Sequence, residues 1–169
     1  MTPELDRLLT ALEPASEENL DQRLKFGLLC ATRVAHLIEQ PEALSCLEAL
    51  RAIVQGQDIK SELPALIARS SELANRHQGS QSLDGVGHAA VSATYACAKA
   101  IAGRARQAAE YAAYAAVYGQ GGYGATSDPV AFEPEFQWQA QQLQCLLAAR
   151  QHAHSAAQPI AQPDPLRPG

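Results

Sequence analysis

The chain has 169 residues and a mass of 18.0 kDa; 47% of its residues are hydrophobic, only 5% are aromatic, and its formal net charge at pH 7 is −5. This length suits one domain with a sizeable core. The acidic balance offers no clustered excess of Lys and Arg for phosphate groups, so nucleic acid is not an expected partner.

The composition predicts an all-α fold. Most of the apolar residues are Ala and Leu, which lose little free energy on entering a helix. No alternating pattern of the strand type extends over a useful length. We expect one domain, a bundle of about six to seven helices around an alanine-rich helical pair.

Four helices are predicted in the first half of the chain, from apolar periodicity and from their start and stop residues. They cover about residues 4–13, 17–39, 42–54 and 61–76. Ser16, followed by two glutamates, is typical of an N-cap at the start of the second helix. Gly56 is placed to end the third.

The segment from about 84 to 119 is exceptionally rich in alanine, with fourteen alanines in residues 88–117. We interpret it as two helices, or as one long helix with a bend at Gly103. Small residues recur at helical spacing on both sides of this glycine, which lets helix axes approach closely. Tyr111, Tyr114 and Tyr118 share one edge and are expected to pack across the alanine surface.

The glycine-rich residues 119–124 are predicted to end that helix in a mobile loop reaching to about 133. A phosphate-binding loop would need a preceding strand and a following Lys, and neither is present. A last helix is predicted over about 134–151, with Trp138 in the core, although an interface anchor is a second interpretation. The predicted division is a helical domain over 1–152 and a disordered tail, rich in Pro, Gln and Ala, over 153–169.

No catalytic, cofactor-binding or metal-binding residue is predicted, and we expect neither an enzyme nor a cofactor. The four cysteines (Cys30, Cys46, Cys97 and Cys145) form no Cys-x-x-Cys pair and are expected to be reduced, buried apolar residues. No histidine lies three residues after a glutamate, the spacing of helical metal sites. A metal-dependent helical enzyme built on the histidines is therefore a minor hypothesis.

Residues 1–21 contain six acidic residues and one basic residue. One interpretation is a solvated surface whose acids complement helix N-termini. The other is an acidic docking surface, whose candidate partner-binding residues are Glu13, Glu17, Glu18 and Asp21. The acidic start lacks the basic region of a signal peptide, and charged residues interrupt the alanine-rich stretch, so we expect no membrane partner and a cytoplasmic location.

Several stretches together resemble the Imm5-like family of bacterial immunity proteins. They are the two alanine-rich segments, 88–103 and 106–116, the segment 24–34, and residues 135–139, which read Glu-Phe-Gln-Trp-Gln and are followed by Leu143. In that family, paired alanine-rich helices precede a final helix with a Glu-Arg-x-Trp-Gln…Leu-Pro signature. Phe136 and Gln144 stand where the family tends to have Arg and Pro.

The resemblance spans roughly residues 17–147. It implies a cytoplasmic immunity protein that binds and neutralises a cognate protein toxin. The alternative is a non-catalytic helical ligand-binding or regulatory module, with the alanine-rich pair and its tyrosine edge as a pocket wall. The sequence leaves a homo-oligomer open.

Overall fold

The computed structural model describes residues 1–56, 60–77 and 86–157. These residues form seven α-helices: α1 (Pro3–Ala11), α2 (Glu17–Arg33), α3 (Pro41–Val54), α4 (Leu63–Arg76), α5 (Val86–Ile101), α6 (Ala105–Thr126) and α7 (Glu133–Ala157). Short 3₁₀ turns, η1 (Ala35–Leu37), η2 (Lys60–Glu62) and η3 (Pro129–Phe132), precede α3, α4 and α7. No β-strand occurs in these ranges, and the predicted all-α class is confirmed.

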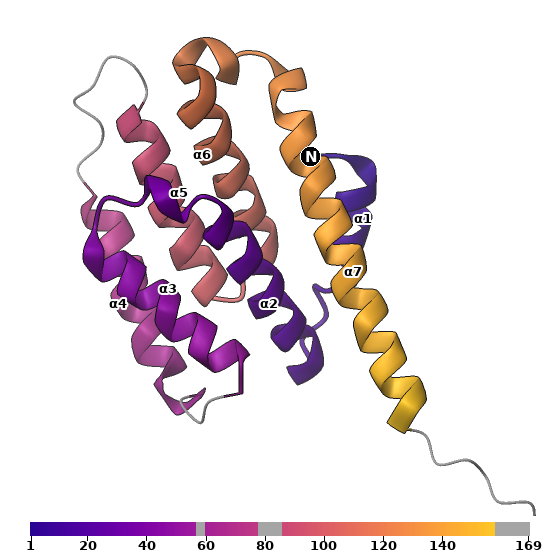
Figure 1. The fold of residues 1–169 in the computed structure, drawn as a ribbon. Coiled ribbons are helices and arrows are strands. Elements are labelled where there is room, and N and C mark those ends of the chain that lie inside the picture. The colour runs from indigo at the N-terminus through magenta and orange to yellow at the C-terminus, as the bar shows by residue number, and fades with distance from the viewer. Residues whose placement is uncertain (57–59, 78–85, 158–169) are drawn as a thin grey trace, which may run out of the picture.

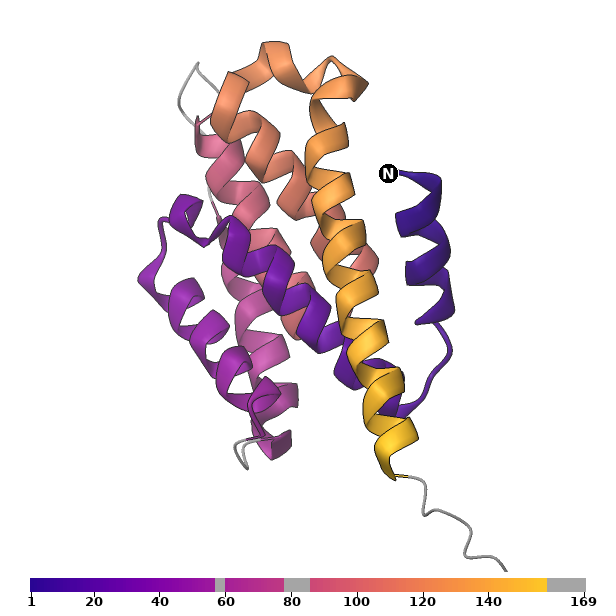
Figure 2. The same cartoon turned by 45° about the vertical axis from the view of Figure 1, so that its right-hand side comes forward.

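Helices α5 and α6 form an antiparallel hairpin at the centre of the molecule, and α2 packs against both of them (Figure 1). Helices α3 and α4 cover one side of this central group. Helices α1 and α7 lie side by side on the other (Figure 2). No helix in the described ranges is long and apolar enough to cross a membrane.

Alanines fill the centre of the bundle. Those of α5 and α6 that are fully buried are Ala89, Ala93, Ala96, Ala100, Ala108, Ala109, Ala112, Ala113 and Ala115. The large buried side chains come mainly from the surrounding helices, among them Leu5 of α1, Phe26 of α2 and Leu50 of α3. The small-residue stripes of the sequence therefore form a closely packed centre, and leucines complete the core around it.

Helices α2 and α5 approach each other closely in this centre. A Cβ atom added to Gly27 of α2 would lie 2.8 Å from the Cα of Ala100 in α5, which is closer than real side chains come. Glycine at this position is thus a packing requirement, since any side chain would push the two helices apart.

Gly103 separates α5 from α6. Its φ of +65° is in the left-handed region, and the Arg104 N–H donates to the carbonyl of Lys99 at 2.9 Å, as in a glycine-ended helix. Of the two interpretations of this segment, two helices are confirmed and one bent helix is wrong. The part of the predicted helix before Val86 lies outside the described residues.

The second predicted helix ends earlier than expected. Ser16 caps α2, accepting from the Asn19 N–H at 3.0 Å, as predicted. However, α2 ends at Arg33 rather than near Glu39, and η1 follows. The apolar stripe continues into this turn because Ile38 is still buried there, so periodicity alone extends the helix too far.

Helix α6 breaks at Gly122, inside the range predicted as a loop, but the residues on both sides of this kink are helical and the element extends to Thr126, so a loop over the whole of 119–124 is wrong. Only Gly122 leaves the helical conformation, with φ 58° and ψ −151°. Gly119 packs on Leu37, where an added Cβ would lie 3.3 Å from its Cδ1.

The last helix is longer than predicted. Helix α7 continues to Ala157, past the expected end near 151 and past the domain boundary at 152. The rest of the predicted tail, residues 158–169, lies outside the described residues.

Candidate binding surface

The acidic N-terminal segment binds the chain's own cations. Glu13, just after α1, pairs with Arg106 of α6 at 3.2 Å. Asp6 of α1 pairs with the same guanidinium, which the two carboxylates keep charged: the hydrogen bond to Asp6 is the largest cause raising the pKa of Arg106. Part of the acidic excess therefore attaches α1 to the central hairpin.

The other three candidate residues lie in the first two turns of α2. Glu18 pairs with Arg150 of α7 at 2.6 Å, and Asp21 pairs with Lys25 at 2.7 Å. Glu17 has no ion pair within the described part of the chain. The structure thus brings three of the four residues into internal ion pairs, and their role in docking a partner stays a prediction.

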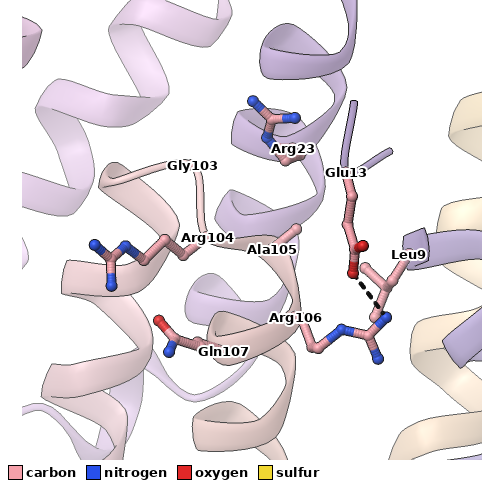
Figure 3. Close-up of a pocket in the computed structure, with 8 residues that line it drawn as sticks. All are labelled: Leu9, Glu13, Arg23, Gly103, Arg104, Ala105, Arg106 and Gln107. Carbon is pink, nitrogen blue, oxygen red and sulfur yellow. Dashed lines mark hydrogen bonds and ion pairs between the residues drawn. The ribbon is translucent and has the colours of Figure 1, made fainter. Parts of the chain in front are cut away.

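A hollow of about 330 Å³ lies beside the turn between α5 and α6 (Figure 3). It is lined by Leu9, Glu13, Arg23, Gly103, Arg104, Ala105, Arg106 and Gln107. The three arginines do not converge. Arg23 donates to the carbonyl of Leu12 at 2.6 Å, and in Figure 3 Arg106 reaches Glu13 while Arg104 points away from it. These contacts hold α1 against α6, and the arginines do not form an anion-binding site.

Three of the four cysteines are buried as predicted, and Cys145 is exposed, so that part of the prediction is wrong. Cys145 follows the buried Leu143 on α7, and its position falls on the outer face of that helix. Burial raises the pKa of the Cys97 thiol to about 12 and that of Cys30 still further. No group of three potential ligands among His, Cys, Asp and Glu could hold a metal ion in the described ranges.

Trp138 is not in the core, contrary to the prediction. It is half-buried, and the guanidinium carbon of Arg33 lies 4.1 Å from its ring centroid. The same arginine donates from Nε to Oε2 of Glu135 at 2.7 Å. The face of the Trp138 ring thus binds the Arg33 guanidinium in a cation–π contact between α2 and α7.

Residues that carry the family resemblance meet at this contact. Arg33, Glu135 and Trp138 form the cluster just described. One turn beyond Glu135, the fully buried Gln139 donates from Nε2 to the carbonyl of Ala109 in α6 at 2.9 Å. The Glu-x-x-Trp-Gln element therefore joins α7 to both α2 and α6, which gives these residues a structural role.

A continuous set of aromatic rings lies at the end of the bundle where α6 passes through η3 into α7. We name it the aromatic ridge: His88, Tyr114, Tyr118, Tyr123, Phe132 and Phe136. Consecutive ring centroids are 5.0 Å apart for Tyr114 and Phe132, and 6.1 Å for Tyr114 and Tyr118. The two views agree that the segment joining α6 to α7 caps this end (Figures 1 and 2).

The ridge is partly open to solvent: two of its tyrosines are exposed, whereas Phe136 is buried. Tyr114 is 46% exposed and Tyr123 49%, and Val130 of η3, in the same connection, is 61% exposed. Elsewhere in the described chain, the exposed large apolar side chains are only Met1 and Leu44, and Met1 belongs to the same end as Tyr114. Exposed apolar area gathered in this way is typical of an interaction surface.

A hollow of about 520 Å³ opens beside the ridge. Its lining residues are Met1, Glu110, Tyr114, Thr126, Pro129, Phe132 and Phe136. Glu110 is the only charged side chain among them. The hollow is open rather than enclosed, because Tyr114 in its wall is nearly half-exposed.

The predicted tyrosine edge is divided in the structure. Tyr114 and Tyr118 belong to the ridge, whereas Tyr111 stacks on Tyr95 of α5 at 5.1 Å. A sequence signal for the ridge exists and was missed: residues 107–149 hold seven of the nine Phe, Trp and Tyr residues. The same 107–149 stretch holds four acidic residues and no Lys, Arg or His.

Comparison with known proteins adds no relative: no family model, no curated protein and no solved structure matches this chain. The resemblance to the Imm5-like immunity proteins therefore rests on the quoted residues alone and stays a prediction.

Proposed function

We propose that this chain is a non-catalytic binding protein that docks a partner protein on the aromatic ridge. Following the family resemblance, we propose that the partner is a bacterial toxin and that the chain neutralises it as an immunity protein. The observation that carries the proposal is the gathering of exposed Tyr114, Tyr123 and Val130 beside an open hollow at one end of the molecule.

The composition of this surface supports a protein partner. Tyr, Phe and Met are enriched in the centres of protein interfaces, and charged residues are depleted there. Ring contacts among the ridge residues hold them in place, so that little side-chain entropy is lost on binding.

A small-molecule module is less well supported. It requires an enclosed pocket beside Tyr111, Tyr114 and Tyr118. The hollow beside Tyr114 is open, and Tyr111 packs on another helix instead. An open apolar hollow of this kind favours a protein partner over a small molecule, which usually binds in an enclosed pocket.

Co-expression tests the proposal. Products of the open reading frames adjacent to this gene are expressed singly in a bacterial host, and growth is measured with and without the chain. We expect one product to be toxic and the chain to restore growth. Val130→Asp, which places a charge on the exposed surface of η3 two residues before Phe132 of the ridge, should abolish the rescue.

Leu44→Asp is the matched control. Leu44 is also an exposed apolar residue, 37% exposed, but it lies on α3, on the other side of the bundle (Figure 1). Its variant should rescue growth as well as the wild type does, and circular dichroism should show both variants folded. Full rescue by a folded Val130→Asp chain, or the absence of any toxic neighbour, would contradict the proposal.

A further inference from the structure

The hollow beside the ridge combines aromatic rings with one carboxylate. Tyr114 and Phe132 meet edge to face at an interplanar angle of 73°, while Phe132 and Phe136 are nearly parallel at 21°. Rings in two orientations therefore bound the same space. We infer that this hollow is a subsite for a cationic side chain of the partner, specifically an arginine; that the partner is a protein rests on the proposed function.

Charge is the first argument. Glu110 is exposed and is the only side chain among the described residues lining the hollow that carries a charge at neutral pH. The surrounding stretch, 107–149, is acidic and contains no basic residue. An incoming cation thus meets a negative potential and aromatic faces together, and both attract positive charge.

Two of the chain's own arginines near this stretch are already bound. Arg106, one turn before Glu110, holds Asp6 and Glu13. Arg33 holds Glu135. Within the described residues Glu110 itself has no ion pair, and its exposed carboxylate is open to a group from outside the chain.

The second argument is a precedent within the same molecule. Two residues after Phe136, the ring of Trp138 binds the Arg33 guanidinium at 4.1 Å, and Glu135 binds its Nε at 2.7 Å. A guanidinium held between a ring and a carboxylate is thus chemistry that this fold already uses. The hollow offers the same two components, Tyr114 or Phe132 with Glu110, to a group in solution.

Shape favours arginine over lysine. The planar guanidinium stacks on ring faces and presents several donors to a carboxylate, whereas an ammonium is a compact and strongly hydrated charge. The volume of about 520 Å³ is within the usual range for ligand sites.

The test is a nuclear magnetic resonance titration of the full chain with N-acetyl-arginine methylamide. The matched ligand is N-acetyl-citrulline methylamide, which has nearly the same shape and no charge. We expect the arginine compound to shift the ring resonances of Tyr114, Phe132 and Phe136, and to bind at least about fivefold more tightly than the citrulline compound.

Two variants locate the effect. Glu110→Gln should reduce the affinity for the arginine compound to that of the citrulline compound, and Glu42→Gln, an exposed acid on α3, should leave it unchanged. Equal affinities for the two compounds, shifts confined to other residues, or no effect of Glu110→Gln would overturn the cation subsite.

The two proposals fail separately. If rescue depends on Val130 but the arginine compound does not bind, the protein-binding ridge stands and the subsite falls. If the compound binds at the three rings but rescue is independent of Val130, the subsite stands and the protein partner falls.

Discussion

Gly27 lies where α2 and α5 come close together, and the geometry of this approach excludes a side chain. The nearest atom to an added Cβ is the Ala100 Cα, which belongs to the backbone of a central helix and cannot rotate away. Packing at this position therefore depends on a single missing methyl group.

We expect Gly27→Ala to lower the free energy of unfolding by ~1–2 kcal/mol, because overpacking outweighs the better helix propensity of alanine. Urea unfolding measures this. Gly124→Ala is the control, since nothing lies within 4 Å of its added Cβ, and its stability should be unchanged or slightly higher. Equal stabilities of the two variants would show that α2 and α5 adjust without strain.

The buried thiol of Cys97 makes stability depend on alkaline pH. Its pKa is raised from 9.0 to about 12, so the unfolded chain loses this proton first. Below about pH 9 the thiol is protonated in both states and does not change the free energy of unfolding with pH. Between about pH 9 and 12 the free energy of unfolding should fall, by at most ~1.4 kcal/mol per pH unit for this group. Urea unfolding at several pH values measures the slope, and Cys97→Ala should make it shallower; an unchanged slope would contradict the assignment.

Helices α2 and α7 are held together near both ends. Arg33 of α2 pairs with Glu135 of α7, and Arg150 of α7 pairs with Glu18 of α2. The first pair is the more important, because the Glu135 side chain is only 6% exposed and its Oε1 has no hydrogen-bond partner in the described chain. Loss of the arginine would leave a buried carboxylate without its cation.

We expect Arg33→Ala to cost ~1–3 kcal/mol of unfolding free energy and to shift the emission of Trp138, whose ring it covers. Urea unfolding followed by tryptophan fluorescence measures both. Arg51→Ala is the control, because its pair with Glu48 is exposed and should contribute less than about 1 kcal/mol. A cost no greater than that of the control would contradict a structural role for this pair.

At the scale of the whole molecule, the acidic N-terminal segment and the aromatic ridge are two candidate contact regions for one partner. Electrostatic steering depends on net charge, whereas docking depends on particular residues. Glu17 separates these effects, since it is exposed and its replacement breaks no internal ion pair in the described chain.

If the acidic segment docks a basic toxin, Glu17→Lys should slow association several-fold at low salt, and the difference should shrink as salt rises. Stopped-flow kinetics with the toxin identified by co-expression measures this. Glu42→Lys makes the same charge change on α3 and should have a smaller effect. Equal effects of the two variants would indicate general steering and no contact at Glu17.

Much of the fold is predictable because helix signals are local. Ser16 caps a helix with its own hydroxyl, and the spacing of the alanines marks the buried faces of α5 and α6. The predictions fail where a residue distant in the sequence determines the local conformation or the burial of a side chain. Gly119 of α6 lies against Leu37, and Arg33 covers Trp138 at the edge of the core.

The sequence by itself determined an all-α chain with an alanine-rich centre, because periodicity states which face of a helix is apolar. Only the tertiary structure decided which helix covers each face. Tyr111 and Tyr114 are one turn apart on α6, yet Tyr111 stacks on Tyr95 of α5 while Tyr114 stays nearly half-exposed. Which tyrosines of α6 are covered therefore depends on the neighbouring helix, and the spacing of the tyrosines does not contain this information.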